Sequence, residues 1–101
     1  MAKNNQDIVT DIKAHIAKSP NTKYGDWYVG IASDPKQRLF SEHNVSQENG
    51  SWIYTEAVSS DAARAVEKYF IEQMKTDGGS GGGDSTTRFV YAYRKTFSTI
   101  E

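Results

Sequence analysis

The stretch WYVGIASDPKQRLFSEHN, residues 27–44, decides the fold of this 101-residue chain. Its first six residues, 27–32, have the composition of a β-strand. Asp34 and Pro35 then predict a helix start, because aspartate caps helices and proline suits the first helical turn. The stretch is therefore a short strand, a tight turn and a capped helix that runs to about residue 43.

The predicted strand has two different faces, because successive side chains in a strand point to opposite sides. One face is apolar, and the other holds Tyr28 followed by the small residues Gly30 and Ala32. Small residues let another group approach the backbone closely. Either a closely packed helix or a ligand could occupy that space, and the strand alone does not distinguish the two.

The rest of the chain supplies two more helices and two more strands. Helical patterns cover residues 4–18, 34–43 and 61–76, and strand-like patterns cover residues 27–32, 52–58 and 88–95. The order is α-β-α-β-α-β. It predicts an α+β domain with a small three-stranded mixed or antiparallel sheet, flanked by three helices.

The length of the chain, residues 1–101, is that of one domain. We expect four regions within it. They are an N-terminal helix (1–20), a central region with the main motifs (27–76), a flexible glycine-rich loop (77–86) and a C-terminal strand (87–97).

Composition excludes several classes of protein. The chain has no cysteine, which excludes disulfide scaffolds and cysteine nucleophiles. It has no apolar run long enough to span a bilayer and no secretory signal, so we expect a cytoplasmic protein without a membrane partner. The net charge is −1, so any binding to nucleic acid would need a local basic patch.

Two charged residues stand out from their helices. Glu67 lies within the apolar stripe of the helix 61–76, where a carboxylate is costly unless it is paired or binds a metal. Arg38 lies four residues before Glu42, so it either forms an exposed pair with that residue or has a role of its own.

The segment that begins at Tyr28 resembles the second half of the GIY-YIG nuclease signature. The sequence YVG at 28–30 stands for YIG, and Arg38 follows Tyr28 at the family's spacing of ten residues. His43 stands about one residue later than in the family. AARAVEKYFIEQM resembles the family's later helix, whose glutamate holds the metal, which is Glu67 here. The resemblance covers roughly residues 27–76.

The chain departs from the family in one important place. The GIY strand that normally precedes YIG has no counterpart upstream of residue 27. The C-terminal sequence FVYAYR resembles such a strand. We therefore expect a permuted domain in which strand 88–95 lies beside strand 27–32, with Tyr91 or Tyr93 supplying the missing phenol.

The resemblance implies a metal-dependent endonuclease that hydrolyses nucleic-acid phosphodiester bonds, with DNA favoured over RNA. Glu67 would hold one Mg²⁺ or Mn²⁺ ion, and Arg38 would grip the scissile phosphate. Tyr28 would orient or deprotonate the attacking water, either directly or through Tyr91. His43 would carry a proton or contact a backbone phosphate. Candidate phosphate contacts are Lys36, Arg64, Lys68 and Arg94.

Two other functions remain open from the sequence. The first is a nucleic-acid-binding module on the same fold without catalysis. The second is a small protein-interaction or adaptor domain. A homodimer that uses the N-terminal helix also remains open.

Overall fold

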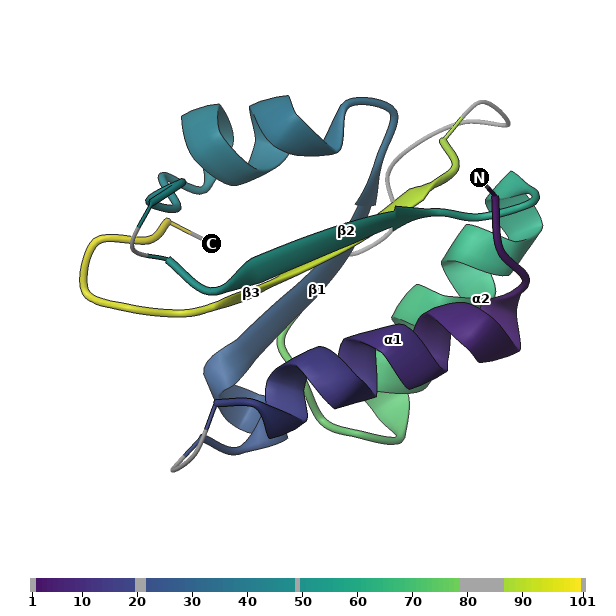
Figure 1. Ribbon diagram of the computed structural model, residues 1–101, viewed down its shortest axis with the longest axis horizontal. Helices are drawn as coiled ribbons and strands as arrows, with labels where there is room; N and C mark the ends of the chain where they lie inside the picture. Colours follow the sequence, from purple (N-terminus) through teal and green to yellow (C-terminus); the bar gives the residue numbers. More distant parts are fainter. Residues whose placement is uncertain (1, 20–21, 49, 79–86, 101) are drawn as a thin grey trace.

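The computed structural model describes residues 2–19, 22–48, 50–78 and 87–100. It contains one antiparallel sheet of three strands (Figure 1). Their order is β1 (Trp27–Ala32), β3 (Phe89–Arg94) and β2 (Trp52–Glu56). The last strand of the chain is thus the middle strand of the sheet. The α+β class is confirmed, and the sheet is antiparallel rather than mixed.

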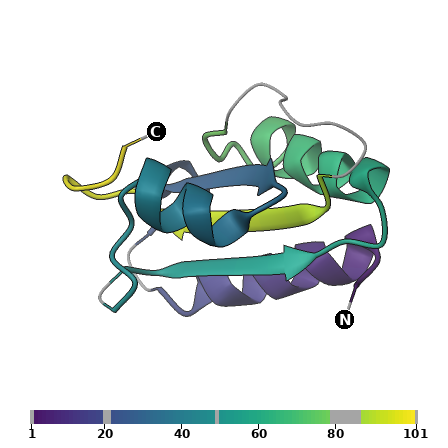
Figure 2. The same ribbon diagram turned by 90° about the horizontal axis from the view of Figure 1, so that it is seen from above.

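Helices lie on both sides of this sheet. The helices α1 (Asn5–Ala17) and α2 (Ser60–Glu72) cover one side, and the short helix η2 (Gln37–Glu42) lies over the other (Figure 1). Figure 2 shows η2 over the sheet and α2 beside β1. A 3-10 turn, η1 (Tyr24–Asp26), leads into β1. Within the described residues, no helix is long and apolar enough to cross a membrane.

Side-chain caps fix where the long helices begin. The Asn4 side chain accepts a hydrogen bond from the Asp7 amide at 2.8 Å, and the Ser59 hydroxyl accepts one from the Ala62 amide at 3.1 Å. The second long helix ends at Glu72, before the expected residue 76. Lys75 has a φ of 65°, a left-handed conformation that does not continue a right-handed helix.

The expected helix after Asp34 is present but has unusual winding. The Asp34 carboxylate caps it by accepting a hydrogen bond from the Gln37 amide at 3.1 Å. The His43 amide donates to the Arg38 carbonyl, five residues back, at 2.8 Å. This is the pattern of a π-helix, which is rare and occurs frequently at functional sites.

The two faces of the sheet bury different side chains. The face toward α1 and α2, which we call the helix face, is apolar. Its buried core includes Ile8, Ile12, Trp27, Val29, Val66, Phe70, Val90 and Ala92. The opposite face, which we call the tyrosine face, lies under η2. Its buried residues are Tyr28, Ala32, Leu39, Val45, Tyr91 and Tyr93.

The register between β1 and β3 confirms the expected neighbours. Tyr28 lies opposite Tyr93, and Gly30 lies opposite Tyr91. Beyond the other edge of β1, Asp77 forms a parallel bridge with Tyr28, and its carbonyl accepts a hydrogen bond from the Val29 amide at 2.9 Å. Asp77, the first residue of the predicted flexible loop, therefore lies beside the edge of the sheet. Residues 79–86 of that predicted loop lie outside the described residues.

Candidate active site

The small residues of β1 make room for a tyrosine of β3. A Cβ atom added to Gly30 would lie 2.6 Å from both Cζ and Oη of Tyr91, much closer than real side chains allow. The space over Gly30 is therefore filled by the phenol ring. Of the two occupants that the sequence left open, a closely packed helix or a ligand, neither fills the space at Gly30.

The phenol of Tyr91 is hydrogen-bonded to His43. Its Oη lies 2.7 Å from Nε2 of the imidazole, and both side chains are buried, with 1% and 6% exposure. The ring of Tyr28 packs against the same imidazole with centroids 4.7 Å apart, and it stacks on Tyr91 at 6.3 Å. Three of the predicted site residues therefore form one cluster.

The other imidazole nitrogen determines the direction of that hydrogen bond. Nδ1 of His43 lies 2.6 Å from the main-chain carbonyl oxygen of Ile100. A carbonyl oxygen can only accept, so Nδ1 carries the hydrogen in the neutral ring. Nε2 then has a free lone pair and accepts from the Tyr91 hydroxyl. His43 is positioned as a proton acceptor for Tyr91.

Sequence reasoning missed the partners that hold the imidazole. The Tyr93 hydroxyl lies 3.1 Å from Nδ1, and the Ile100 carbonyl lies closer still. Tyr93 was considered only as an alternative to Tyr91. A main-chain carbonyl has no side-chain signature, so no sequence pattern could have indicated Ile100.

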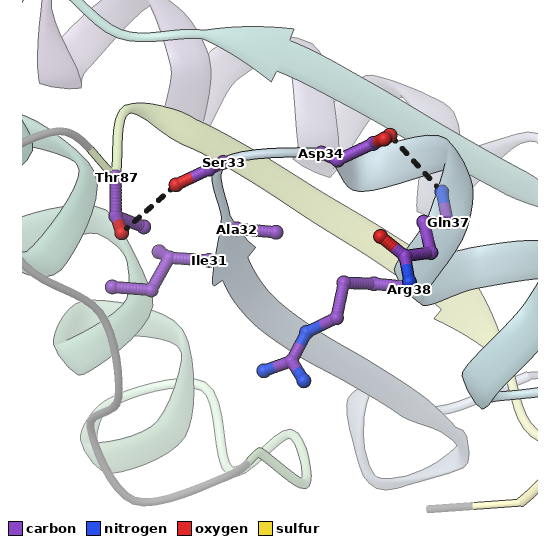
Figure 3. Close-up of a pocket in the computed structure, with 7 residues that line it drawn as sticks. All are labelled: Ile31, Ala32, Ser33, Asp34, Gln37, Arg38 and Thr87. Atoms are coloured by element: carbon purple, nitrogen blue, oxygen red, sulfur yellow. Dashed lines mark hydrogen bonds between the residues drawn. The ribbon is translucent and has the colours of Figure 1, made fainter.

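Arg38 lines a pocket of about 260 Å³ at the end of β1. The other lining residues are Ile31, Ala32, Ser33, Asp34, Gln37 and Thr87. Figure 3 shows the guanidinium group pointing away from the cap formed by Asp34 and Gln37. The Ser33 and Thr87 hydroxyls lie 3.4 Å apart and join the two strands beside the pocket.

Arg38 interacts with Glu42 and with the phenols of Tyr91 and Tyr28. Its Nη1 lies 2.9 Å from Oε1 of Glu42, so the expected exposed ion pair is present. The pKa of Arg38 is raised, chiefly by that bond and also by the nearby phenols of Tyr91 and Tyr28. An exposed pair contributes little to stability. The guanidinium can therefore exchange Glu42 for another anion at small cost.

The buried phenol of Tyr91 strongly holds its proton. Burial raises the pKa of Tyr91, and the neighbouring Tyr28 adds to the increase. The guanidinium of Arg38 acts in the opposite direction, through its charge and a hydrogen bond, while the charge of Glu67 raises the pKa further. At neutral pH the group is a phenol, and it can give up its proton only to a well-placed acceptor.

Glu67 lies on α2, in the helix layer that covers the helix face of the sheet. Only 9% of the residue is exposed, and burial raises the pKa of its carboxyl, while the charge of Arg64 lowers it. The charge of Glu67 is also among the causes that raise the pKa of Tyr91. Across the described part of the chain, no side-chain hydrogen bond or ion pair of Glu67 is found, so the structural salt bridge considered from the sequence is not seen there.

The predicted phosphate-binding residues are exposed but do not all gather at the site. Lys36 lies in the sequence between Asp34 and Gln37, which line the Arg38 pocket. Arg64 and Lys68 lie on either side of Glu67 in the sequence of α2. Arg94 lies three residues from Tyr91 along β3, about 10 Å at 3.3 Å per residue. Its side chain also alternates away from the tyrosine face, so Arg94 lies apart from the proposed site.

The donor set fits one hard cation. Mg²⁺ commonly takes one or two carboxylates and keeps several waters. Glu67 offers a largely buried carboxylate, and none of residues 2–19, 22–48, 50–78 and 87–100 forms a cluster of three or more His, Cys, Asp or Glu side chains. A site formed by several protein ligands is therefore not seen in this part of the chain, while a single carboxylate with waters is compatible with it.

Comparison with known proteins adds no relative to this description. A scan against protein-family models found no match, and searches of curated proteins and of solved structures found no significant match. What the site can do must therefore be argued from its own residues.

Proposed function

We propose that this chain is a metal-dependent endonuclease and a permuted relative of the GIY-YIG nucleases. One observation carries the proposal. Tyr28, Tyr91 and His43 form one buried cluster, and the charges of Arg38 and Glu67 both act on Tyr91. The five residues come from four separate segments, and all of them were singled out as catalytic candidates by sequence.

The chemistry requires a water molecule that loses a proton as it attacks phosphorus. A phenol with a raised pKa is a poor base by itself, because its phenolate is scarce at neutral pH. The geometry supports a relay instead. As the water gives a proton to Oη of Tyr91, the phenol proton moves to Nε2 of His43 over the 2.7 Å hydrogen bond. His43 becomes an imidazolium, with its Nδ1 hydrogen held by the Ile100 carbonyl.

Arg38 would bind the phosphate under attack. Its planar guanidinium matches two phosphate oxygens and keeps its charge at any physiological pH. The pocket of about 260 Å³ that Arg38 lines offers space for the phosphate. Binding would replace the exposed bond to Glu42 with a stronger bond to phosphate.

Glu67 would hold one Mg²⁺ or Mn²⁺ ion near the reacting phosphate. The bound ion would stabilise negative charge on the phosphate oxygens and on the leaving oxygen. The protein supplies a carboxylate that costs free energy when it is buried and ionised, and a cation would offset that cost.

The π-helical winding of η2 supports the resemblance at the position of His43. His43 stands about one residue later than the family pattern. A π-helical turn closes over five residues rather than four, so it takes up one extra residue. The bond from the His43 amide to the Arg38 carbonyl spans that turn. The imidazole therefore still reaches Tyr91.

A cleavage assay with Mg²⁺ or Mn²⁺ on DNA and RNA tests the proposal. We expect Arg38→Ala and Glu67→Ala each to lower kcat about 10²- to 10³-fold, the size typical of a lost charge-stabilising group. Exposed residues provide matched controls: Lys18→Ala removes a cation from the C-cap of α1, and Glu72→Ala removes a carboxylate from α2. Cleavage that survives in both site variants, or that needs no metal, would contradict the proposal.

A nucleic-acid-binding module without catalysis is the second candidate. The net charge of −1 and the pairing of Arg38 with Glu42 favour this candidate. Neither feature is that of a strong general nucleic-acid binder. Its signature in the same experiment is salt-sensitive binding without cleavage by the unmodified protein.

A further inference from the structure

The chain after β3 turns back to the candidate site. Residues 95–100, which we call the C-terminal strap, are bonded at both ends. The Lys95 amide donates to the Asp26 carbonyl at 2.9 Å. At the far end, the Ile100 amide donates to the His43 carbonyl at 2.7 Å, while the Ile100 carbonyl accepts from Nδ1 of the same residue at 2.6 Å. The strap therefore holds His43 by its main chain and by its ring.

Two further features give the strap a defined shape. Its turn is closed by bonds from the Thr96 amide to the Thr99 hydroxyl at 2.9 Å and from the Ser98 amide to the Thr96 hydroxyl at 3.2 Å. Asn44 adds an anchor, since its Nδ2 donates to the Ser98 carbonyl at 2.8 Å. Asn44 has a φ of 57°, a left-handed conformation that asparagine tolerates better than most residues.

Hydrogen bonds, rather than the burial of apolar side chains, hold the C-terminal strap in place. The Ile100 residue is 60% exposed, so its side chain contributes little hydrophobic stabilisation. What Ile100 places against the core is its carbonyl oxygen. That oxygen can only accept a hydrogen bond, and it therefore selects the tautomer of His43.

We propose that the C-terminal strap is a positioning element that holds His43 as its Nδ1–H tautomer, so that the free lone pair of Nε2 faces the Tyr91 hydroxyl. The catalytic consequence rests on the proposed nuclease function, and the orientation of the imidazole does not. Without the strap, the ring can place a hydrogen on Nε2 and can rotate. Tyr91 then loses its proton acceptor.

Nitrogen NMR of the full chain tests the orientation directly. The two histidines of the sequence give separate signals, and His15, which lies near Ser51, provides an internal control. We expect the unmodified protein to show Nδ1–H at His43. A chain that ends after Phe97 lacks the Ile100 carbonyl and should lose that tautomer, while the signals of His15 and of the helix-face core stay unchanged.

A milder variant covers the case in which the shortened chain does not fold. Asn44→Asp keeps the shape and tolerance of the left-handed residue but replaces the donor to Ser98 with an acceptor. We expect a partial loss of the Nδ1–H tautomer of His43. Asn5→Asp, the same chemical change on an exposed residue of α1, should leave it unchanged. An unaltered His43 tautomer in both strap variants would overturn the proposal.

Cleavage kinetics separate this proposal from the proposed function. If the unmodified protein cleaves nucleic acid, we expect the shortened chain to lose about 10²-fold in kcat, the low end for a lost base, with KM within about twofold. A changed tautomer with unchanged kcat would overturn the positioning role. If the unmodified protein does not cleave, the proposed function fails. A tautomer that changes only in the strap variants then still supports the strap as the element that orients His43.

Discussion

The helix face and the tyrosine face of the sheet differ in what fills them. The helix face is packed by aliphatic and aromatic carbon from α1 and α2. The tyrosine face buries phenols and an imidazole, joined by hydrogen bonds at 2.7 and 3.1 Å. Buried polar groups are costly unless every one is satisfied. The first face therefore serves stability, and the second uses part of that stability to hold polar groups in a fixed arrangement.

The residues that alternate along β3 contribute to both faces. Val90 and Ala92 belong to the helix face, and Tyr91 and Tyr93 belong to the tyrosine face. The two tyrosines are therefore held by the same strand that contributes to the apolar core. The difference between the faces predicts that substitutions can change stability and activity separately.

The largest effect on stability is expected on the helix face. Phe70 is completely buried, so Phe70→Ala should lower the free energy of unfolding by about 3–5 kcal/mol. Urea unfolding measures the loss, with the exposed Glu72→Ala as a control from the same helix. Where the variant is still folded, kcat for cleavage should stay near that of the unmodified protein. A large loss of kcat in the folded variant would show that the faces are not separable.

Gly30→Ala should affect both properties. The new Cβ would lie 2.6 Å from the phenol of Tyr91, and overpacking of this kind costs about 1–3 kcal/mol. Displacing the ring also breaks its hydrogen bond to His43. We expect reduced stability in urea and an altered His43 signal by NMR. Gly25→Ala is the matched control, because its nearest atom would be 3.8 Å away; equal effects of the two would contradict the close packing.

Glu67 should lower stability when it is ionised. Burial raises the pKa of its carboxyl above the ordinary 4.5, so the folded state binds the proton more tightly than the unfolded state. This contribution to stability is complete below pH 4.5 and is lost as the pH rises through the folded pKa. Glu67→Gln should therefore be more stable than the unmodified protein at pH 7, with a smaller difference at pH 4. Urea unfolding at both values, without metal, checks the sign.

Arg38 should have the smallest effect on stability of these residues. Its pair with Glu42 is exposed, so Arg38→Gln should change the free energy of unfolding by less than about 0.5 kcal/mol. Cleavage should nevertheless fall strongly. A loss of several kcal/mol would instead identify Arg38 as a structural residue of the tyrosine face.

The sequence predicted local features well, because these depend on neighbours in the chain. Asp34 was expected as a cap, and its carboxylate accepts a hydrogen bond from the Gln37 amide near its own helix start. The two different faces expected for the strand 27–32 are also present, since Val29 packs in the helix-face core and Tyr28 on the tyrosine face. The π-helical winding of η2 was not predicted. Over the 6 residues of η2, the apolar pattern of a π-helix does not differ enough from that of an α-helix to be recognised.

By itself, the sequence determined the candidate residues and the two faces of the first strand. Side-chain alternation and helix spacing follow from backbone geometry alone. Only the tertiary structure decided that β3 lies between β1 and β2, which brings Tyr91 over Gly30. It also decided which atom holds the imidazole of His43, the carbonyl of Ile100. Every residue has such a carbonyl, and only the folded chain selects one of them by bringing distant segments within hydrogen-bonding distance.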